Sequence, residues 1–303
     1  MSDPSSAHAL LRPRILGPFV LVALIWGSTW YVITGQIGDV DASWSIAWRF
    51  AMATPAMFAL ALIMGRSLRI GRAGHWLALF IGISQFCANF NFVYRAELHL
   101  TSGIVAVMFG LLMVPNAIFG RVFLGHNVTR RVLLGGLLAS IGIALLLVHE
   151  GRLARLDGNI TLGIGLAIGG ILAASIANVI QANPTGKALP MVSLLAWSML
   201  YGTIVDITLA WFTAGPPSFP MRWDYWAGTA WLALAGSVVT FPLYYQIVRE
   251  IGPSRAAYNS ILVIVVAMLI STFVEGYQWS LLAAAGAGLA IAGMVLALRS
   301  RSA

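Results

Sequence analysis

Amide and hydroxyl side chains recur inside apolar stretches of this sequence at helical spacing. Gln85 and Asn89 lie four residues apart, and Ser175, Asn178 and Gln181 follow one another at intervals of three. Residues three or four apart share one face of an α-helix. Such faces can hydrogen-bond to the carboxylate and the ammonium group of a small zwitterion. The pattern therefore predicts polar stripes on two helices that face a common cavity.

Aromatic and further polar side chains complete the candidate binding site. Trp26 and Trp30 share one helical face, and Thr240 and Tyr244 share another around Pro242. The full candidate set is Trp26, Trp30, Gln85, Asn89, Met108, Ser175, Asn178, Thr240, Tyr244 and Asn259. Aromatic faces can hold an apolar side chain or a cationic ammonium group. The alternative interpretation is that the polar members only join helices through hydrogen bonds, each worth roughly 0.6–2 kcal/mol.

Two charged residues, Arg49 and Asp206, lie deep inside apolar segments. Ionisable groups in such positions are costly and indicate function by default. The two could pair with each other, and Asp206 could bind a proton; a purely structural salt bridge is the alternative. Tyr94, Pro115 and Tyr245 are candidates for gate or hinge elements, because a proline removes a backbone hydrogen bond from a helix.

The composition decides which class of protein must position these groups. Of 303 residues, 59% are hydrophobic and only 9% are charged, and the mean hydropathy is +0.87. Soluble globular chains carry about 25% charged residues, so that class is excluded. The formal charge of +8 is spread over short segments rather than gathered in a patch, which argues against nucleic acid as a partner. The sequence shows no Cys/His cluster for a metal, no cofactor motif, and no convincing nucleophile or acid–base pair for an enzyme.

Apolar runs of about 20 residues, the length of a membrane-spanning helix, fill the sequence almost from end to end. We predict an all-α integral membrane protein with ten transmembrane helices. Their ranges are about 15–35, 43–64, 75–94, 101–121, 131–149, 160–181, 190–214, 226–247, 255–274 and 279–298. The loops between them are too short to hold a soluble domain.

The basic residues are divided unevenly between the two sides of the predicted bundle. One set of loops holds only Arg95, Arg152, Arg155 and Arg222, whereas the loops on the side of the termini hold all the others except Arg49. Cytoplasmic loops carry the excess of Lys and Arg in membrane proteins. We therefore expect both termini in the cytoplasm and the bundle in the cell inner (plasma) membrane.

An internal repeat at an offset of 151 residues divides the chain into two halves. The matched pairs include Tyr94 with Tyr245, Gly125 with Gly276, Gly135 with Gly286, and Gly142 with Gly293. The predicted units are residues 15–149 and 160–298, with five spans each. Because five is odd, the second unit must enter the membrane from the opposite side, which makes an inverted repeat. Secondary transporters with this architecture bind their substrates near the midplane between the halves.

Four segments carry a recognisable pattern. They are LIWGSTWYV (24–32), WRFAMA (48–53), YRAELHLTSGIVAVMFGLLMVP (94–115) and YYQIVREIGPSRAAYNSILVIVVAMLISTFVEG (244–276). Together they resemble the EamA-type transporters of the drug/metabolite transporter superfamily, and the aromatic-rich spans look most similar to aromatic amino acid exporters of the YddG type. Two positions depart from the family pattern. His126 stands where an acidic residue is usual, and Val266 stands where a proline would match Pro115.

The resemblance implies a monomeric secondary transporter that exports amino acids, aromatic or apolar ones, by alternating access. An exporter of other small metabolites or of cationic drugs is the alternative within this class. An integral-membrane enzyme or sensor is the alternative outside it. The expected partners are a small-molecule substrate and the lipid bilayer, with no cofactor. Whether transport is proton-coupled or facilitative stays open from the sequence.

Overall fold

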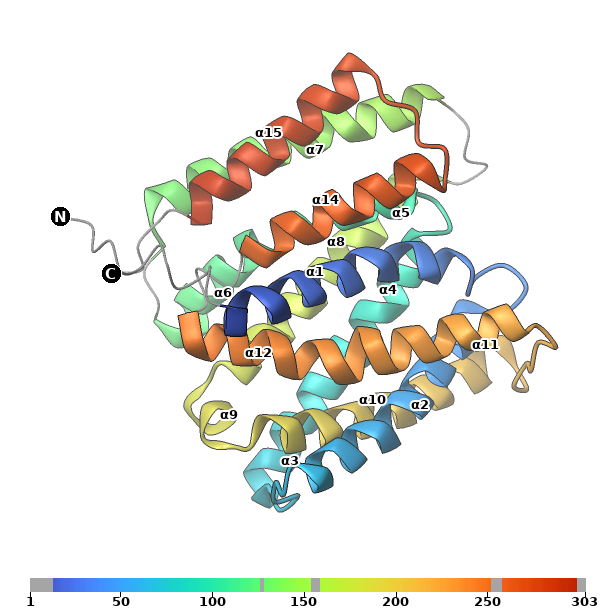
Figure 1. Cartoon of the computed structure of the whole chain (residues 1–303), viewed down its shortest axis with the longest axis vertical. Helices are drawn as coiled ribbons and strands as arrows, with labels where there is room; N and C mark the ends of the chain where they lie inside the picture. Colours follow the sequence, from blue (N-terminus) through green and yellow to red (C-terminus); the bar gives the residue numbers. More distant parts are fainter. Residues whose placement is uncertain (1–12, 126–127, 154–158, 252–257, 299–303) are drawn as a thin grey trace.

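Helices form all the regular secondary structure of the described residues, which are 13–125, 128–153, 159–251 and 258–298 of a computed structural model (Figure 1). The all-helical prediction is therefore confirmed over these ranges. The uninterrupted helices are α1 (Pro13–Thr34), α2 (Ala42–Ile63), α7 (Arg130–Leu153), α8 (Ile160–Gln181), the short α9 (Pro184–Ala188), α10 (Met191–Ala214), α14 (Tyr258–Phe273) and α15 (Leu281–Leu298).

Three further spans change their helical type along their length. The third span consists of α3 (Gly71–Ile81), the π-helix η2 (Gly82–Asn89) and α4 (Phe90–Ala96). The fourth consists of α5 (Ser102–Phe109), the 3₁₀ turn η3 (Gly110–Leu112) and α6 (Met113–Leu124). The eighth consists of α11 (Trp223–Ala230), the π-helix η4 (Trp231–Val239) and α12 (Thr240–Ile251). A π-helix has more residues per turn than an α-helix, so side chains on either side of it change their relative orientation.

Eight of these helical segments are long and apolar enough to cross a membrane, and their ends agree with the first eight predicted spans within four residues. The predicted ninth and tenth spans correspond to two shorter apolar helices, α14 with 16 residues and α15 with 18. At 1.5 Å per residue, α14 is about 24 Å long, against a hydrocarbon core of about 30 Å. The first residues predicted for the ninth span, 255–257, lie outside the described part of the chain, as does His126.

Polar residues mark where several spans begin. The Asp41 carboxylate accepts a hydrogen bond from the backbone N–H of Ser43 at 2.8 Å, at the start of α2. The Asn159 side chain accepts one from Leu162 at 3.0 Å, at the start of α8. These side chains satisfy backbone donors that have no partner within the helix.

Helices α7 and α15 pack against each other through glycines. A Cβ atom at Gly135 would lie 2.4 Å from the carbonyl oxygen of Gly293, and one at Gly142 would lie 2.5 Å from that of Gly286. The backbones are therefore in direct contact, as small-residue spacings in membrane helices allow. Because the contact partner moves backwards along α15 as α7 advances, the two helices run antiparallel. They form one edge of the molecule (Figure 1).

The opposite edge is formed by α2 and α10, which also run antiparallel. The Thr54 and Thr203 hydroxyls are 2.9 Å apart, while Ser43, near the start of α2, lies 3.4 Å from Thr213, near the end of α10. Between the two edges, α1 packs against α14 and α12, and α8 packs against α4 and α6 (Figure 1). These central helices surround the cavity described next.

Candidate functional site

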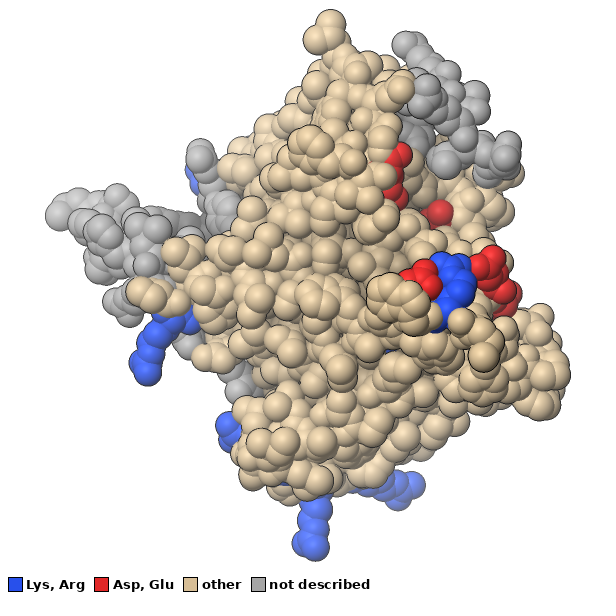
Figure 2. Space-filling model, turned by 45° about the vertical axis from the view of Figure 1, so that its right-hand side comes forward, with Lys and Arg blue, Asp and Glu red and all other residues tan. Residues whose placement is uncertain are grey.

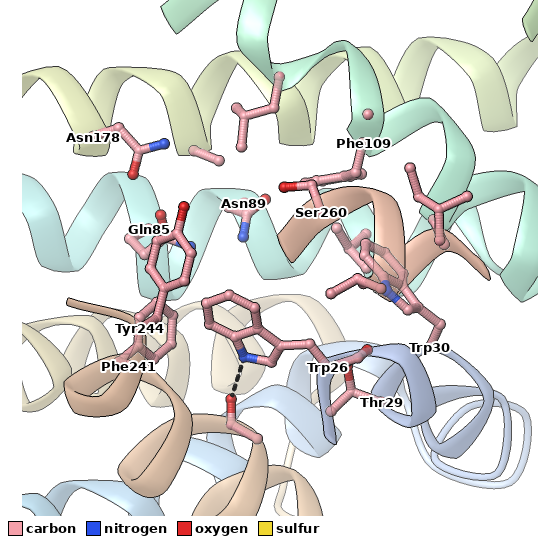
Figure 3. A pocket seen from close by; sticks show the side chains of 18 of the residues that line it. Trp26, Thr29, Trp30, Gln85, Asn89, Phe109, Asn178, Phe241, Tyr244 and Ser260 are labelled. Carbon is pink, nitrogen blue, oxygen red and sulfur yellow. Dashed lines mark hydrogen bonds between the residues drawn. The ribbon is translucent and has the colours of Figure 1, made fainter. Parts of the chain in front are cut away.

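A cavity of about 280 Å³ lies at the centre of the bundle, between the central helices (Figure 3). Its walls come from α1, α2, the third and fourth spans, α8, the eighth span, α14 and α15. Both predicted halves of the chain therefore contribute. Ligand sites of small molecules are typically apolar and carry a few convergent polar groups, and this cavity has that composition.

Most of the predicted binding residues line this cavity. They are Trp26, Trp30, Gln85, Asn89, Asn178 and Tyr244, joined by Arg49 and Tyr245 from the predicted gating set. Figure 3 shows Trp26, Tyr244, Gln85, Asn89 and Asn178 around the same space, although they come from four different spans. The helical-face argument thus brought together residues that are distant in the sequence.

The other four predicted binding residues, Met108, Ser175, Thr240 and Asn259, do not line the cavity. All four are buried, and each lies next to a residue that does line it: Phe109, Ala174, Phe241 and Ser260, respectively. One residue along an α-helix turns the side chain by about 100°, so the prediction of the face missed by a single step.

Local geometry explains two of these corrections. Thr240 follows directly on the π-helix η4, which changes the orientation expected from α-helical spacing. The Asn259 side chain points instead toward α1 and donates a hydrogen bond to the carbonyl oxygen of Phe19 at 2.6 Å. In the regular α8, Ala174 and Asn178 line the cavity at a spacing of four, which leaves Ser175 on the packed side.

Aromatic rings form much of the wall. The Trp26 ring lies 5.6 Å from that of Phe241 and 5.1 Å from that of Tyr244, and Trp30 lies 5.1 Å from Phe109. The Trp26 indole nitrogen donates a hydrogen bond of 3.2 Å to the carbonyl oxygen of Gly236, drawn as a dashed line in Figure 3. This bond holds the ring with one face available to the cavity.

Amide groups provide polar contacts in the same space. The Asn89 side chain is buried, and its Oδ1 atom has no hydrogen-bond partner. Asn178 donates a long hydrogen bond of 3.4 Å to Asn116, which also lines the cavity. Buried polar atoms are normally hydrogen-bonded, so an acceptor such as Asn89 Oδ1 is available to a ligand donor.

Arg49 places a positive charge at the cavity wall. Its side chain is 2% exposed, its guanidinium lies 4.3 Å from the centre of the Phe90 ring, and its Nε atom has no partner. Its other nitrogens donate long hydrogen bonds to the hydroxyls of Tyr94, at 3.4 Å, and Ser237, at 3.3 Å. Among the described residues no carboxylate lies within ion-pair distance of Arg49.

Asp206 does not pair with Arg49, in contrast to the pairing considered from the sequence. Its Oδ1 atom accepts a hydrogen bond from Asn91 at 3.0 Å, and its Oδ2 atom has no partner. Asn91 in turn accepts a hydrogen bond of 2.6 Å from Arg95, whose second nitrogen donates to Ser43 at 2.7 Å. Asp206 is thus linked to a different arginine, and it lies outside the cavity lining.

The remaining gating candidates occupy different places. The buried Tyr94 contacts Arg49 and does not line the cavity, whereas Tyr245 lines it and donates a hydrogen bond to Gln181. Pro115 lies in the first turn of α6, directly after the 3₁₀ turn η3. The fourth span therefore changes its helical type next to the proline.

Sequence reasoning missed several lining residues, among them Phe90, Phe109, Phe241 and Ser260. The repeat contained a signal that could have found them. At the offset of 151 residues, Phe90 corresponds to Phe241 and Phe109 corresponds to Ser260, and all four line the cavity.

The model of the EamA-like transporter family matches the chain twice, at residues 15–148 and 161–299. This chain belongs to the EamA-like transporter family. It is a multi-pass membrane protein, and each match spans one of the two units predicted from the sequence repeat.

Similar proteins from several organisms carry transporter names. The chain is 27% identical to the uncharacterized transporter YyaM of Bacillus subtilis, over 91% of this chain and 90% of YyaM. It is 26% identical to the uncharacterized inner membrane transporter YedA of Escherichia coli, over 93% and 90%. It is 21% identical to protein PagO of Salmonella typhimurium, over 86% and 85%.

A solved crystal structure has the same fold. It superposes with a TM-score of 0.69 and covers 96% of both chains at 17% sequence identity. At this identity the likeness concerns the fold alone.

Proposed function

We propose that this chain is a secondary transporter that exports small amphipathic carboxylates, aromatic or apolar amino acids first among them, across the inner membrane. The observation that carries the proposal is Arg49, a buried cation at the cavity wall with no carboxylate partner among the described residues. A buried, unpaired charge is costly. A substrate carboxylate would supply the missing counter-charge.

The guanidinium group suits this task. Arginine presents a planar set of donors that matches a carboxylate, and such charge-assisted hydrogen bonds are about twice as strong as neutral ones. The bonds from Arg49 to Tyr94 and Ser237 are long, at 3.4 and 3.3 Å. They can therefore yield to an incoming carboxylate at little cost.

The rest of the cavity fits the other parts of such a substrate. The free Oδ1 atom of Asn89 can accept a hydrogen bond from an ammonium group. The rings of Trp26, Trp30 and Phe241 can hold an apolar or aromatic side chain. Cationic drugs fit less well, because Arg49 repels a cation.

Transport by alternating access is supported by the way the two halves meet. Gly135 of α7 corresponds to Gly286 of α15 in the repeat, and Gly142 corresponds to Gly293. Since Gly135 contacts Gly293 and Gly142 contacts Gly286, the interface is self-complementary, as a two-fold arrangement requires. The antiparallel course of these equivalent helices supports an inverted repeat with one substrate site between the halves. One chain suffices for this architecture, so we propose a monomer.

The distribution of charge supports cytoplasmic termini. Figure 2 shows acidic side chains gathered on one face around a basic one, whereas other Lys and Arg side chains project from the far end. On the acidic side, Arg222 forms ion pairs with Asp39 at 2.5 Å and Asp224 at 2.6 Å. The excess of basic residues at the other end is typical of the cytoplasmic side. The export direction itself rests on the resemblance to YddG-type exporters.

Release from proteoliposomes tests the proposal. Purified protein is reconstituted, and vesicles are loaded in parallel with labelled phenylalanine, labelled threonine or tetraphenylphosphonium. We expect release of phenylalanine to exceed that from empty liposomes by the widest margin. Release of the lipophilic cation alone would contradict the assignment of a carboxylate substrate, and release of none of the three would contradict amino acid transport.

A further inference from the structure

Glu97 is a buried carboxyl group outside the cavity lining. It follows α4 directly, in the turn that leads to α5, and its side chain is 7% exposed. Neither of its carboxyl oxygens has a hydrogen-bond partner. An ionised carboxylate in such surroundings is strongly disfavoured, so the natural occupant of this group is a proton.

A second acidic residue approaches from the other half of the chain. Glu275 lies in the turn between α14 and α15, where its Oε2 atom accepts a hydrogen bond of 2.6 Å from the hydroxyl of Ser102, the first residue of α5. The charged groups that act on Glu97 from neighbouring elements are Glu275 and Arg49; Tyr94 lies on the preceding turn. Burial, and then the charge of Glu275, raise the pKa of Glu97 well above its usual range, against the opposing effect of Arg49.

This pair of turns lies next to a tight helix contact that adjoins the cavity. A Cβ atom at Gly103 of α5 would lie 2.8 Å from the sulfur of Met268 and 2.9 Å from Cβ of Ser271, both in α14. One turn inward, Val93 and Ala106 line the cavity. The contact between α5 and α14 therefore separates the cavity from the face of the molecule that carries the two turns.

We propose that Glu97 is a proton-binding site that controls opening of the cavity toward this face. With the proton bound, the α4–α5 turn stays packed against the α14–α15 turn. Release of the proton to water leaves a carboxylate in a buried position facing the negative charge of Glu275. Repulsion and the gain in hydration then favour separation of the two turns.

The site lies beside the substrate cavity and uses other residues, so it stands independently of the proposed substrate. A carrier with such a group exchanges protons with the compartment on this side during its cycle. That assigns proton-coupled transport, the option that the sequence left open.

The experiment measures the gate and the proton without any substrate. In a Cys87→Ser background, spin labels are attached at Leu98→Cys and Val274→Cys, two exposed positions in the respective turns. We expect a longer label-to-label distance to replace the shorter one as the pH rises, with the 10–90% change spread over about two pH units, as for a single titrating group. Infrared difference spectra recorded in parallel should show loss of one protonated carboxyl band over the same range.

Variants decide whether Glu97 is responsible. Glu97→Gln, which resembles the protonated form, should hold the short distance at all pH values and lack the infrared band. Glu275→Gln should shift the midpoint to lower pH, because it removes a neighbouring negative charge. Asp39→Asn, at an acid whose side chain is 71% exposed, serves as the control and should titrate like the parent protein.

Two results would overturn the proposal. One is a distance that does not change with pH in the parent protein. The other is a pH-dependent change that persists in Glu97→Gln with the same midpoint. Since neither result depends on a transported molecule, failure here is distinguishable from failure of the proposed substrate class.

Discussion

Arg49 and Asp206 are both buried within membrane-spanning helices, but their surroundings differ. Asp206 is connected through Asn91 to Arg95, so its charge has a nearby opposite charge within the protein. Arg49 meets only hydroxyls and aromatic rings, and it borders the cavity. The comparison teaches that an intramembrane charge indicates a binding site when its counter-charge is missing and a cavity lies beside it. A charge whose partner is already supplied by the fold indicates a structural network.

The largest effect is expected at Arg49. Arg49→Gln keeps a polar side chain of similar reach but removes the charge, and loss of a buried charge pair costs roughly 2–5 kcal/mol. Substrate affinity should therefore fall at least about 30-fold, measured as concentration dependence of uptake in proteoliposomes. Arg49→Lys should be intermediate, because it keeps the charge without the planar donor set. Unchanged affinity in Arg49→Gln would end the distinction between the two charges.

Asp206→Ala should affect stability instead of transport. It leaves the Asn91 amide without its acceptor, and an unsatisfied buried group costs about 1–3 kcal/mol. We expect a lower unfolding midpoint in detergent and normal transport per correctly folded molecule. Loss of transport at full stability would instead place Asp206 in the transport cycle.

Glu97 extends the comparison to a third buried charge and predicts a pH dependence of stability. Its pKa is raised by folding above the ordinary value of 4.5, so the native protein binds this proton more tightly than the unfolded chain. The stabilisation is fully present below the unfolded pKa and is lost as the pH rises through the native pKa, with a slope of at most about 1.4 kcal/mol per pH unit. Unfolding midpoints measured from acidic to alkaline pH should decline for the parent protein and decline less for Glu97→Gln. Equal declines would show that another group is responsible.

The smallest effect is expected at Tyr94. Tyr94→Phe removes one long hydrogen bond to Arg49, which is worth about 0.5–1.5 kcal/mol at most. Substrate affinity should change by less than about tenfold. Tyr225→Phe removes a comparable hydroxyl contact to Ser45, away from the cavity, and should leave affinity unchanged. An equal effect of both variants would point to general loosening of the bundle.

Much of the fold could be predicted because a membrane allows few solutions. Without water, each span must satisfy its own backbone hydrogen bonds as a helix, so apolar run length fixed most span ends within a few residues. The side-chain directions were harder. Met108, Thr240 and Asn259 were each assigned one residue away from the lining position. An uninterrupted α-helical period was assumed, and η4, next to Thr240, does not keep it.

The partners of the charges could not be predicted for a different reason. Arg95 was assigned to a loop, yet its side chain reaches back one turn to Asn91. Long cationic side chains can extend along a helix toward a buried acceptor, as they also do toward the membrane surface. Sequence spacing gives no sign of that choice, which depends on where Asp206 of a distant helix happens to lie.

The glycine contact between α7 and α15 has a thermodynamic consequence. Glycine loses no side-chain rotamer entropy when it is ordered, and helices in lipid associate through van der Waals contact without a hydrophobic driving force. The contact at Gly135 and Gly142 therefore lacks the large heat-capacity term that makes soluble cores weaken on cooling. This edge of the protein should hold its strength across growth temperatures, as a fixed frame for the helices around the cavity.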